Sequence, residues 1–166
     1  MIEAAVPGTQ VERRVVMIAP SWVVQPGDEI ADAGLRGRGG AGFPTGTKWR
    51  SVASGGGRHH YAVCNAAEGE PGTFKHTALL RANPYAVLEG LLIAAESVGA
   101  RDAYLAMKAS FEPELASVRR ALGEIEAASW LDEITVTIAP APTSTSSVRK
   151  REVVPGLVEV RWRSPA

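Results

Sequence analysis

Residues 83–109 read NPYAVLEGLLIAAESVGARDAYLAMKA, and their pattern decides the fold class. Asn83 is a favourable helix cap, Pro84 suits the first helical position, and Gly99 suits a helix end. The apolar side chains that repeat at helical spacing between these signals are Val87, Leu88, Leu91, Leu92 and Ala95. The segment therefore predicts a core helix, followed by a strand over residues 102–109.

The flanking segments alternate in the same way. Residues 61–64 predict a short buried strand, residues 113–128 an amphipathic helix, and residues 134–138 a further strand. A short helix is also expected from Asp28, after a turn at residues 25–27. Strands that alternate with helices predict an α/β fold, with a mainly parallel sheet, helices on its faces and right-handed crossovers.

Composition limits the possible functions. The 166 residues carry 18 basic and 18 acidic side chains and are 45% hydrophobic, which suits one globular domain and makes nucleic acid an unexpected partner. The single cysteine, Cys64, excludes an internal disulfide and any cluster or zinc site built wholly from this chain's thiolates. Redox chemistry would therefore need a bound cofactor. No apolar stretch approaches the roughly 18 residues of a membrane span, so we expect a cytoplasmic protein.

Residues 37–46, GRGGAGFPTG, predict a loop because five glycines and a proline do not suit a helix or strand interior. Gly37, Gly39 and Gly42 fit the G-x-G-x-x-G spacing, which lets backbone N–H groups approach a phosphate, although no strand is expected before them. Phe43 either stacks on a ligand ring or anchors the loop in the core. The basic residues beside the loop are Arg36, Arg38 and Lys48. The alternative is a mobile glycine loop without a ligand.

A second candidate segment, residues 65–72, follows the strand predicted over 61–64. The carboxyl ends of parallel strands hold ligands in open α/β sheets. Glu68 and Glu70 alternate there and should point the same way, so they can accept hydrogen bonds from ribose hydroxyls or amides. The alternative is a solvated acidic turn. No metal site is expected, since His59 and His60 lack partners at ligand spacing.

Two stretches together carry a family resemblance: GLRGRGGAGFPTGTKW at 34–49 and NAAEGEPGTFKHTALLRANPY at 65–85. They resemble the NADH-binding flavoprotein subunit of respiratory complex I and its relatives in NAD-linked hydrogenases and formate dehydrogenases. The resemblance implies a Rossmann-like FMN-binding domain, of which residues 28–142 would be an incomplete first part. Residues 1–27 would then be an N-terminal extension and residues 143–166 an atypical, disordered tail.

The resemblance also implies a function. The family binds FMN, accepts a hydride from NADH at the flavin, and passes electrons to iron–sulfur clusters and quinone through partner subunits. No iron–sulfur cluster is expected within this chain, and no side chain is expected to act as a catalytic acid or base. The cofactor-binding residues carried over by motif are Gly37, Arg38, Gly39, Gly40, Ala41, Gly42, Phe43, Gly46, Lys48, Asn65, Glu68 and Glu70. Lys48 would contact FMN and the nicotinamide region, Asn65 and Glu68 would line the flavin pocket, and Glu70 would meet NADH.

Several positions depart from the family pattern. Ala67 stands where many relatives have a flavin-bonding aspartate, and the Gly-Glu-Glu loop expected after residues 134–138 is missing. We therefore expect weak FMN binding and weak or no activity in the isolated chain. The alternatives are a non-catalytic truncated remnant without stable cofactor, and an adaptor that binds flavin or nucleotide without electron transfer.

The composition changes abruptly after Pro142, where residues 143–150 read TSTSSVRK. In relatives of the resembled family whose strand is followed by Asp-Glu-Tyr-Leu-Phe-Gly-Glu-Glu-Lys, removing the first base of one DNA that encodes this stretch gives codons for TSTSSVRK. We therefore interpret the tail as the product of a shifted reading frame, unselected for packing. Sequencing the gene tests this: restoring one base after Pro142 should recover the family stretch, and a DNA that does not yield it makes the tail genuine.

Overall fold

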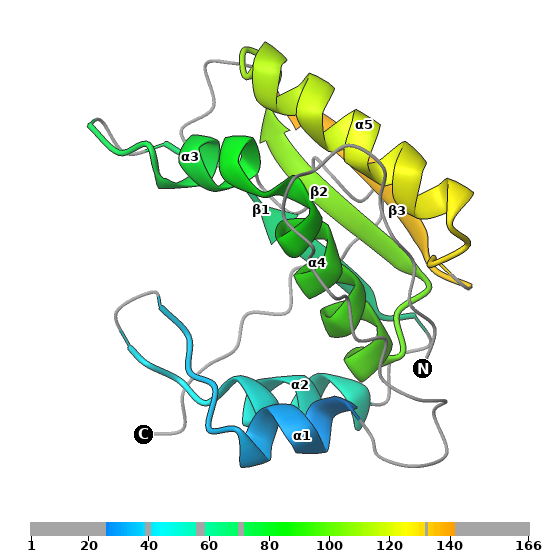
Figure 1. The fold of residues 1–166 in the computed structure, drawn as a ribbon. Helices are drawn as coiled ribbons and strands as arrows, with labels where there is room; N and C mark the ends of the chain where they lie inside the picture. The colour runs from blue at the N-terminus through cyan, green and yellow to red at the C-terminus, as the bar shows by residue number, and fades with distance from the viewer. Residues whose placement is uncertain (1–25, 39–40, 56–58, 70–71, 132, 142–166) are drawn as a thin grey trace.

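The computed structural model describes residues 26–38, 41–55, 59–69, 72–131 and 133–141, so the predicted tail and most of the predicted N-terminal extension lie outside it. The elements, in chain order, are α1 (Pro26–Asp32), α2 (Thr45–Ala53), β1 (Tyr61–Asn65), α3 (Lys75–Ala82), α4 (Pro84–Val98), β2 (Asp102–Lys108), α5 (Glu112–Ala127) and β3 (Thr135–Ala141). Figure 1 shows their arrangement.

The three strands form a parallel sheet in the order β1-β2-β3. Asn65 of β1 pairs with Ala106, and Asp102 of β2 pairs with Thr135 of β3. Helices α3 and α4 connect β1 to β2, and α5 connects β2 to β3. The predicted α/β fold with a parallel sheet is confirmed.

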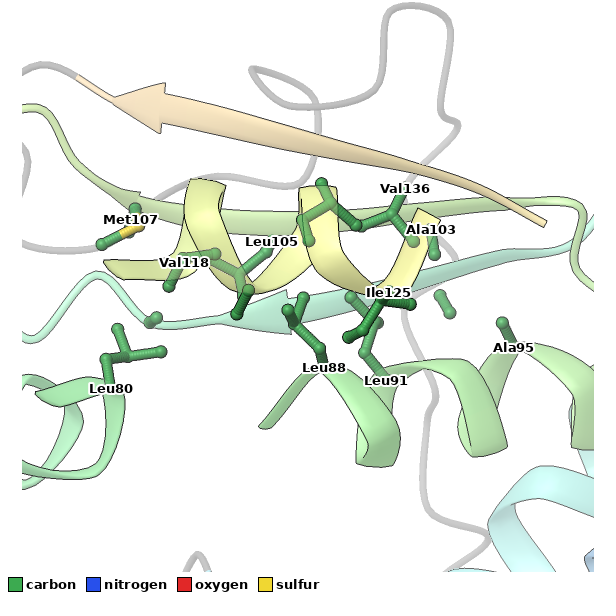
Figure 2. Packing of buried hydrophobic residues seen from close by; sticks show 14 of the residues in the cluster. Leu80, Leu88, Leu91, Ala95, Ala103, Leu105, Met107, Val118, Ile125 and Val136 are labelled. Atoms are coloured by element: carbon green, nitrogen blue, oxygen red, sulfur yellow. The ribbon is translucent and has the colours of Figure 1, made fainter. Parts of the chain in front are cut away.

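The main core lies between one face of the sheet and the helices α3, α4 and α5 (Figure 2). Leu105 of the central strand is fully buried, and Leu88 of α4 and Val118 of α5 belong to the same cluster. A smaller cluster on the other face centres on Ala67 and Ala106, and no described helix contributes to it. The side chains of β2 thus alternate between two clusters, as the two-residue period of a strand requires.

Helix α4 has the ends that its sequence predicts. The Asn83 side chain accepts a hydrogen bond from the Ala86 N–H at 3.3 Å, and Pro84 occupies the first helical position. Gly99 ends the helix in the left-handed region, with φ of 65°, where a side chain would be strained. These local signals therefore fix both ends of the helix.

Among the described residues, no single helix is long and apolar enough to cross a bilayer. Only α3 and α4 taken together reach that length and composition, and they are bent by 101° relative to each other. Leu88, Leu91 and Ala95 of α4 are buried in the protein core.

Three sequence expectations are wrong. The turn expected at residues 25–27 is not seen in its described part, because Pro26 and Gly27 form the first turn of α1. Helices α2 and α3 are not expected from the sequence, and Gly46 lies inside α2 rather than in the glycine loop. The residues before these two helices, Pro44 and Phe74, provide no side-chain cap, so the usual start signal is missing.

Gly46 is required by the packing of α2 on α1. A Cβ atom at position 46 would lie 2.6 Å from the Cβ atom of Ala31 and 2.7 Å from its Cα atom. Real Cβ atoms do not approach backbone so closely, so the two helices could not keep their spacing with any larger residue. The family glycine at this position therefore has a structural explanation in this chain.

We predict that Gly46→Ala lowers the free energy of unfolding by about 1–3 kcal/mol, because the overlap with Ala31 exceeds the gain in helix propensity. Gly90→Ala is the matched control, since it also lies within a helix but its added Cβ would meet nothing within 4 Å. That control should be neutral or stabilising by up to about 1 kcal/mol. Thermal unfolding followed by circular dichroism measures both, and equal midpoints would contradict the packing argument.

Candidate functional site

The glycine loop is closed by hydrogen bonds at its base. The Gly37 N–H donates to the Phe43 carbonyl at 2.9 Å, and the Thr45 N–H donates to the Leu35 carbonyl at 2.8 Å. The Arg36 side chain donates to the Gly42 carbonyl at 3.1 Å. The loop is therefore a short hairpin-like turn with a defined base.

The tip of this loop presents backbone donors. Among the described residues, no backbone hydrogen bond uses the N–H groups of Arg38, Ala41 or Gly42. Gly42 has φ of 57°, in the left-handed region that favours glycine. The predicted site residues Gly39 and Gly40 lie outside the described residues. The described part of the tip can thus donate hydrogen bonds to a ligand.

Helix α2 follows the glycine loop and carries a cation in its first turn. Lys48 is exposed in the first turn of α2, whereas its neighbour Trp49 packs against the main core. Arg50 forms an exposed ion pair with Asp28 of α1 at 3.0 Å, which links the surfaces of the two helices. Phe43 keeps 40% of its surface exposed, so the structure does not support the alternative that it is an anchor buried in the core.

The second candidate segment begins at the carboxyl end of β1. The Asn65 side-chain oxygen accepts a hydrogen bond from the Ala67 N–H at 3.1 Å, which forms a turn that starts at the strand end. The Ala66 N–H donates to the Ala106 carbonyl at 2.7 Å and extends the pairing with β2. Asn65 is exposed, so its amide nitrogen remains accessible at the sheet edge.

Glu68 has a role that its position in the sequence did not predict. Its side chain is only 7% exposed, and it accepts hydrogen bonds from the backbone N–H groups of His76 at 3.2 Å and Thr77 at 3.4 Å. The Thr77 hydroxyl donates to the same carboxylate at 3.3 Å. Glu68 therefore caps the N-terminus of α3 from eight residues upstream, and the alternative of a solvated acidic turn is wrong for this residue.

These contacts set the charge state of Glu68. Burial pushes the pKa of its carboxyl group upward, but the hydrogen bonds from the His76 and Thr77 backbone, together with the His76 charge, act more strongly in the opposite sense. The net pKa lies below the ordinary value for glutamate. Glu68 is thus a buried carboxylate at neutral pH.

The two candidate segments keep separate local hydrogen-bond networks in the described residues. In the view of Figure 1 both lie on the left side of the molecule, the loop before α2 below and the turn before α3 above. Glu70 lies outside the described residues. That the two segments share one pocket remains a prediction.

Comparison with known proteins decides the family. Residues 30–152, most of the chain, match the family described as the Nuo51 FMN-binding domain. The chain belongs to this FMN-binding family. The match contains both candidate segments, and it reaches beyond the predicted boundary at residue 142.

Curated members of this family are similar to the chain in sequence. The NADH-quinone oxidoreductase F subunit of Streptomyces coelicolor is 40% identical over 121 residues, which cover 73% of this chain and 26% of the relative. The protein of the same name in Rickettsia bellii is 42% identical over 103 residues, covering 62% of this chain and 24% of the relative. The chain thus spans about a quarter of the length of these relatives.

A solved structure supports the same assignment. A chain in the crystal structure of an NAD⁺-reducing [NiFe]-hydrogenase in the H₂-reduced state matches with a TM-score of 0.64 and 40% identity. The match covers 70% of this chain and 20% of that one. The resemblance inferred from residues 34–49 and 65–85 is therefore confirmed at the level of family and fold.

The described residues fit an FMN-type ligand. The loop tip offers backbone donors without a Cβ at Gly42, Lys48 supplies an exposed positive charge, and Asn65 supplies an amide at the strand end. A flat ring with an anionic group needs such a combination of close backbone and positive charge. Lys108 was not singled out from the sequence, although it ends β2 at the same edge of the sheet, where the rule applied to β1 also directs attention.

We predict that Glu68→Gln lowers the free energy of unfolding at pH 7 by about 1–3 kcal/mol, since it weakens the charged cap of α3. Because the folded-state pKa of Glu68 is lowered, the stabilisation by its carboxylate is fully present above the unfolded pKa of about 4.3. It is lost as the pH falls through the lower folded-state pKa. Chemical denaturation between pH 3 and 7 should show a shallower acid loss in the variant.

Glu89→Gln is the control for this prediction, because it removes the same charge from an exposed position on α4. It should leave both the stability at pH 7 and its acid dependence close to those of the unchanged protein. If Glu68→Gln and Glu89→Gln behave alike, Glu68 does not stabilise α3 through its charge.

Proposed function

We propose that the glycine loop and the β1–α3 turn form one site that binds FMN and NADH, so that a hydride passes from NADH to FMN and electrons continue to iron–sulfur subunits and quinone. The observation that carries the proposal is the glycine loop, which has a hydrogen-bonded base and is followed in the first turn of α2 by the exposed Lys48. The family match and the NADH-linked and NAD⁺-linked names of the relatives support it.

Each group in the site has a role in this proposal. The N–H groups of Arg38, Ala41 and Gly42 donate to oxygen atoms of the bound nucleotides, and Lys48 compensates their negative charge. The exposed Phe43 ring packs on a nicotinamide or adenine ring. The Asn65 amide donates at the edge of the flavin. Gly37, Gly39 and Gly40 keep the backbone close to the ligand, and Glu70 contacts NADH.

FMN, when bound, accepts the hydride and releases electrons one at a time. The protein contributes by positioning the nicotinamide against the flavin and by excluding water, which needs no acid or base side chain. Glu68 acts as a structural residue of the site, because its carboxylate binds the turn that follows Asn65 to the start of α3. We also propose that the partners are iron–sulfur subunits of a larger complex.

We expect weak FMN binding by the chain alone. Ala67 is 3% exposed and packs against Ala106, so the turn carries a buried methyl group where the family pattern has a carboxylate. Reconstitution with excess FMN followed by gel filtration should remove most of the flavin. Stoichiometric flavin after the column would contradict the weak affinity.

Activity is tested with FMN kept in excess. Under anaerobic conditions, NADH should bleach the flavin absorbance, and ferricyanide should restore it. If flavin fluorescence does not change on mixing with the protein and NADH causes no protein-dependent bleaching, the non-catalytic remnant is the correct interpretation. If flavin binds but is not reduced, the adaptor without electron transfer is the correct interpretation.

We predict that Lys48→Ala reduces NADH oxidation about tenfold or more, since a charge-assisted contact contributes about 1.5–3 kcal/mol. Its thermal midpoint should change little, because Lys48 is exposed. Arg119→Ala, at an exposed position on α5, is the control and should change neither property. Parallel losses of activity and stability in Lys48→Ala would instead indicate a structural lysine.

A further inference from the structure

Lys108 stands at the carboxyl end of the central strand. It is the last residue of β2 and is half-buried. Ala106 and Tyr104, two and four residues earlier, belong to the small cluster, whereas Leu105 and Met107 face the main core. Successive side chains of a strand point to opposite faces, so the Lys108 side chain leaves β2 on the face of the sheet that no described helix covers.

The neighbour of Lys108 is the turn that follows β1. Asn65 pairs with Ala106, and the Ala66 N–H donates to the Ala106 carbonyl at 2.7 Å. The segment that follows β1 therefore continues beside the last residues of β2 as far as Ala67. Ala67 contributes only a buried methyl group, so this part of the turn offers Lys108 no carboxylate.

The ammonium group of Lys108 contacts an aromatic ring, and this contact leaves its N–H groups available for hydrogen bonds. Its Nζ atom lies 5.7 Å from the centroid of the Phe111 ring, in a cation–π arrangement. Within the described ranges, no ion pair joins Lys108 to a carboxylate. The buried Glu114 on the first turn of α5 is already paired with Arg81. A half-buried cation without a carboxylate partner attracts an anion more strongly than an exposed one does.

We propose that Lys108 binds a phosphate group of the nucleotide held by the adjacent turn. This inference rests on the proposed function, and it adds a phosphate-binding residue from the central strand to the loop and turn residues. The ligand crevice of an open α/β sheet lies outside the carboxyl ends of its strands, where Lys108 and Asn65 both stand. The phosphate is that of FMN or the pyrophosphate of NADH.

Ligands with and without phosphate test this proposal in the full chain. Lys108→Gln removes the charge, Lys108→Arg retains it, and Arg119→Gln removes the same charge from an exposed site on α5. Fluorescence titrations compare FMN with riboflavin, and NADH with N-benzyl-dihydronicotinamide, which has no phosphate. Thermal midpoints of the variants show whether the loss of the Phe111 contact affects folding.

Lys108→Gln should weaken binding of FMN, of NADH or of both about tenfold or more, with the phosphate-free analogues unchanged. The ligand whose affinity falls identifies the phosphate concerned. Lys108→Arg should restore most of the affinity, and Arg119→Gln should have no effect.

The role of Lys108 would be overturned if Lys108→Gln lost equal affinity for FMN and riboflavin, or if its affinities for FMN and NADH were unchanged. Either result would leave the proposed function intact. If neither flavin binds the unchanged chain at any concentration tested, the proposed function fails, and the role of Lys108 fails with it.

Discussion

The capping of α3 by Glu68 connects the sheet to the rest of the described fold. A carboxylate that is 7% exposed accepts three hydrogen bonds from residues 76 and 77, and so attaches the end of β1 to the start of α3. Helix α3 leads directly into α4, the helix that covers the sheet. The residue before the helix, Phe74, makes no side-chain cap, and Glu68 accepts hydrogen bonds from the N–H groups of the first turn. Asn65, which pairs with Ala106 as the last residue of β1, directly precedes this turn.

A second constraint holds the glycine loop. The loop is not part of the sheet; it joins α1 to α2, and α2 packs on α1 and α4. The close approach of Gly46 to Ala31 fixes the spacing of that helix pair, and the exposed ion pair Arg50–Asp28 lies across it. One ligand segment is thus fixed by packing between helices, and the other by hydrogen bonds at a strand end. A nucleotide that touches both would connect them.

Local signals account for what the sequence predicted correctly. Helix α4 carries its own cap, its own proline and its own terminal glycine, so its bounds follow from residues 83–99 alone. Helices α2 and α3 carry no such signals, since Pro44 and Phe74 precede them, and the cap of α3 comes from Glu68 in another segment. The residues of the candidate site could be named from the family resemblance, but the capping role of Glu68 and the packing role of Gly46 depend on contacts between distant residues.

In the proposed function, the glycine loop and the β1–α3 turn act as one FMN site. Hydrogen exchange measured by mass spectrometry, with and without excess FMN, shows whether both segments contact the ligand. FMN should slow exchange in residues 36–46 and 65–77 together, with α5 unchanged. Protection of only one of these segments, or of neither while FMN is bound, would contradict it.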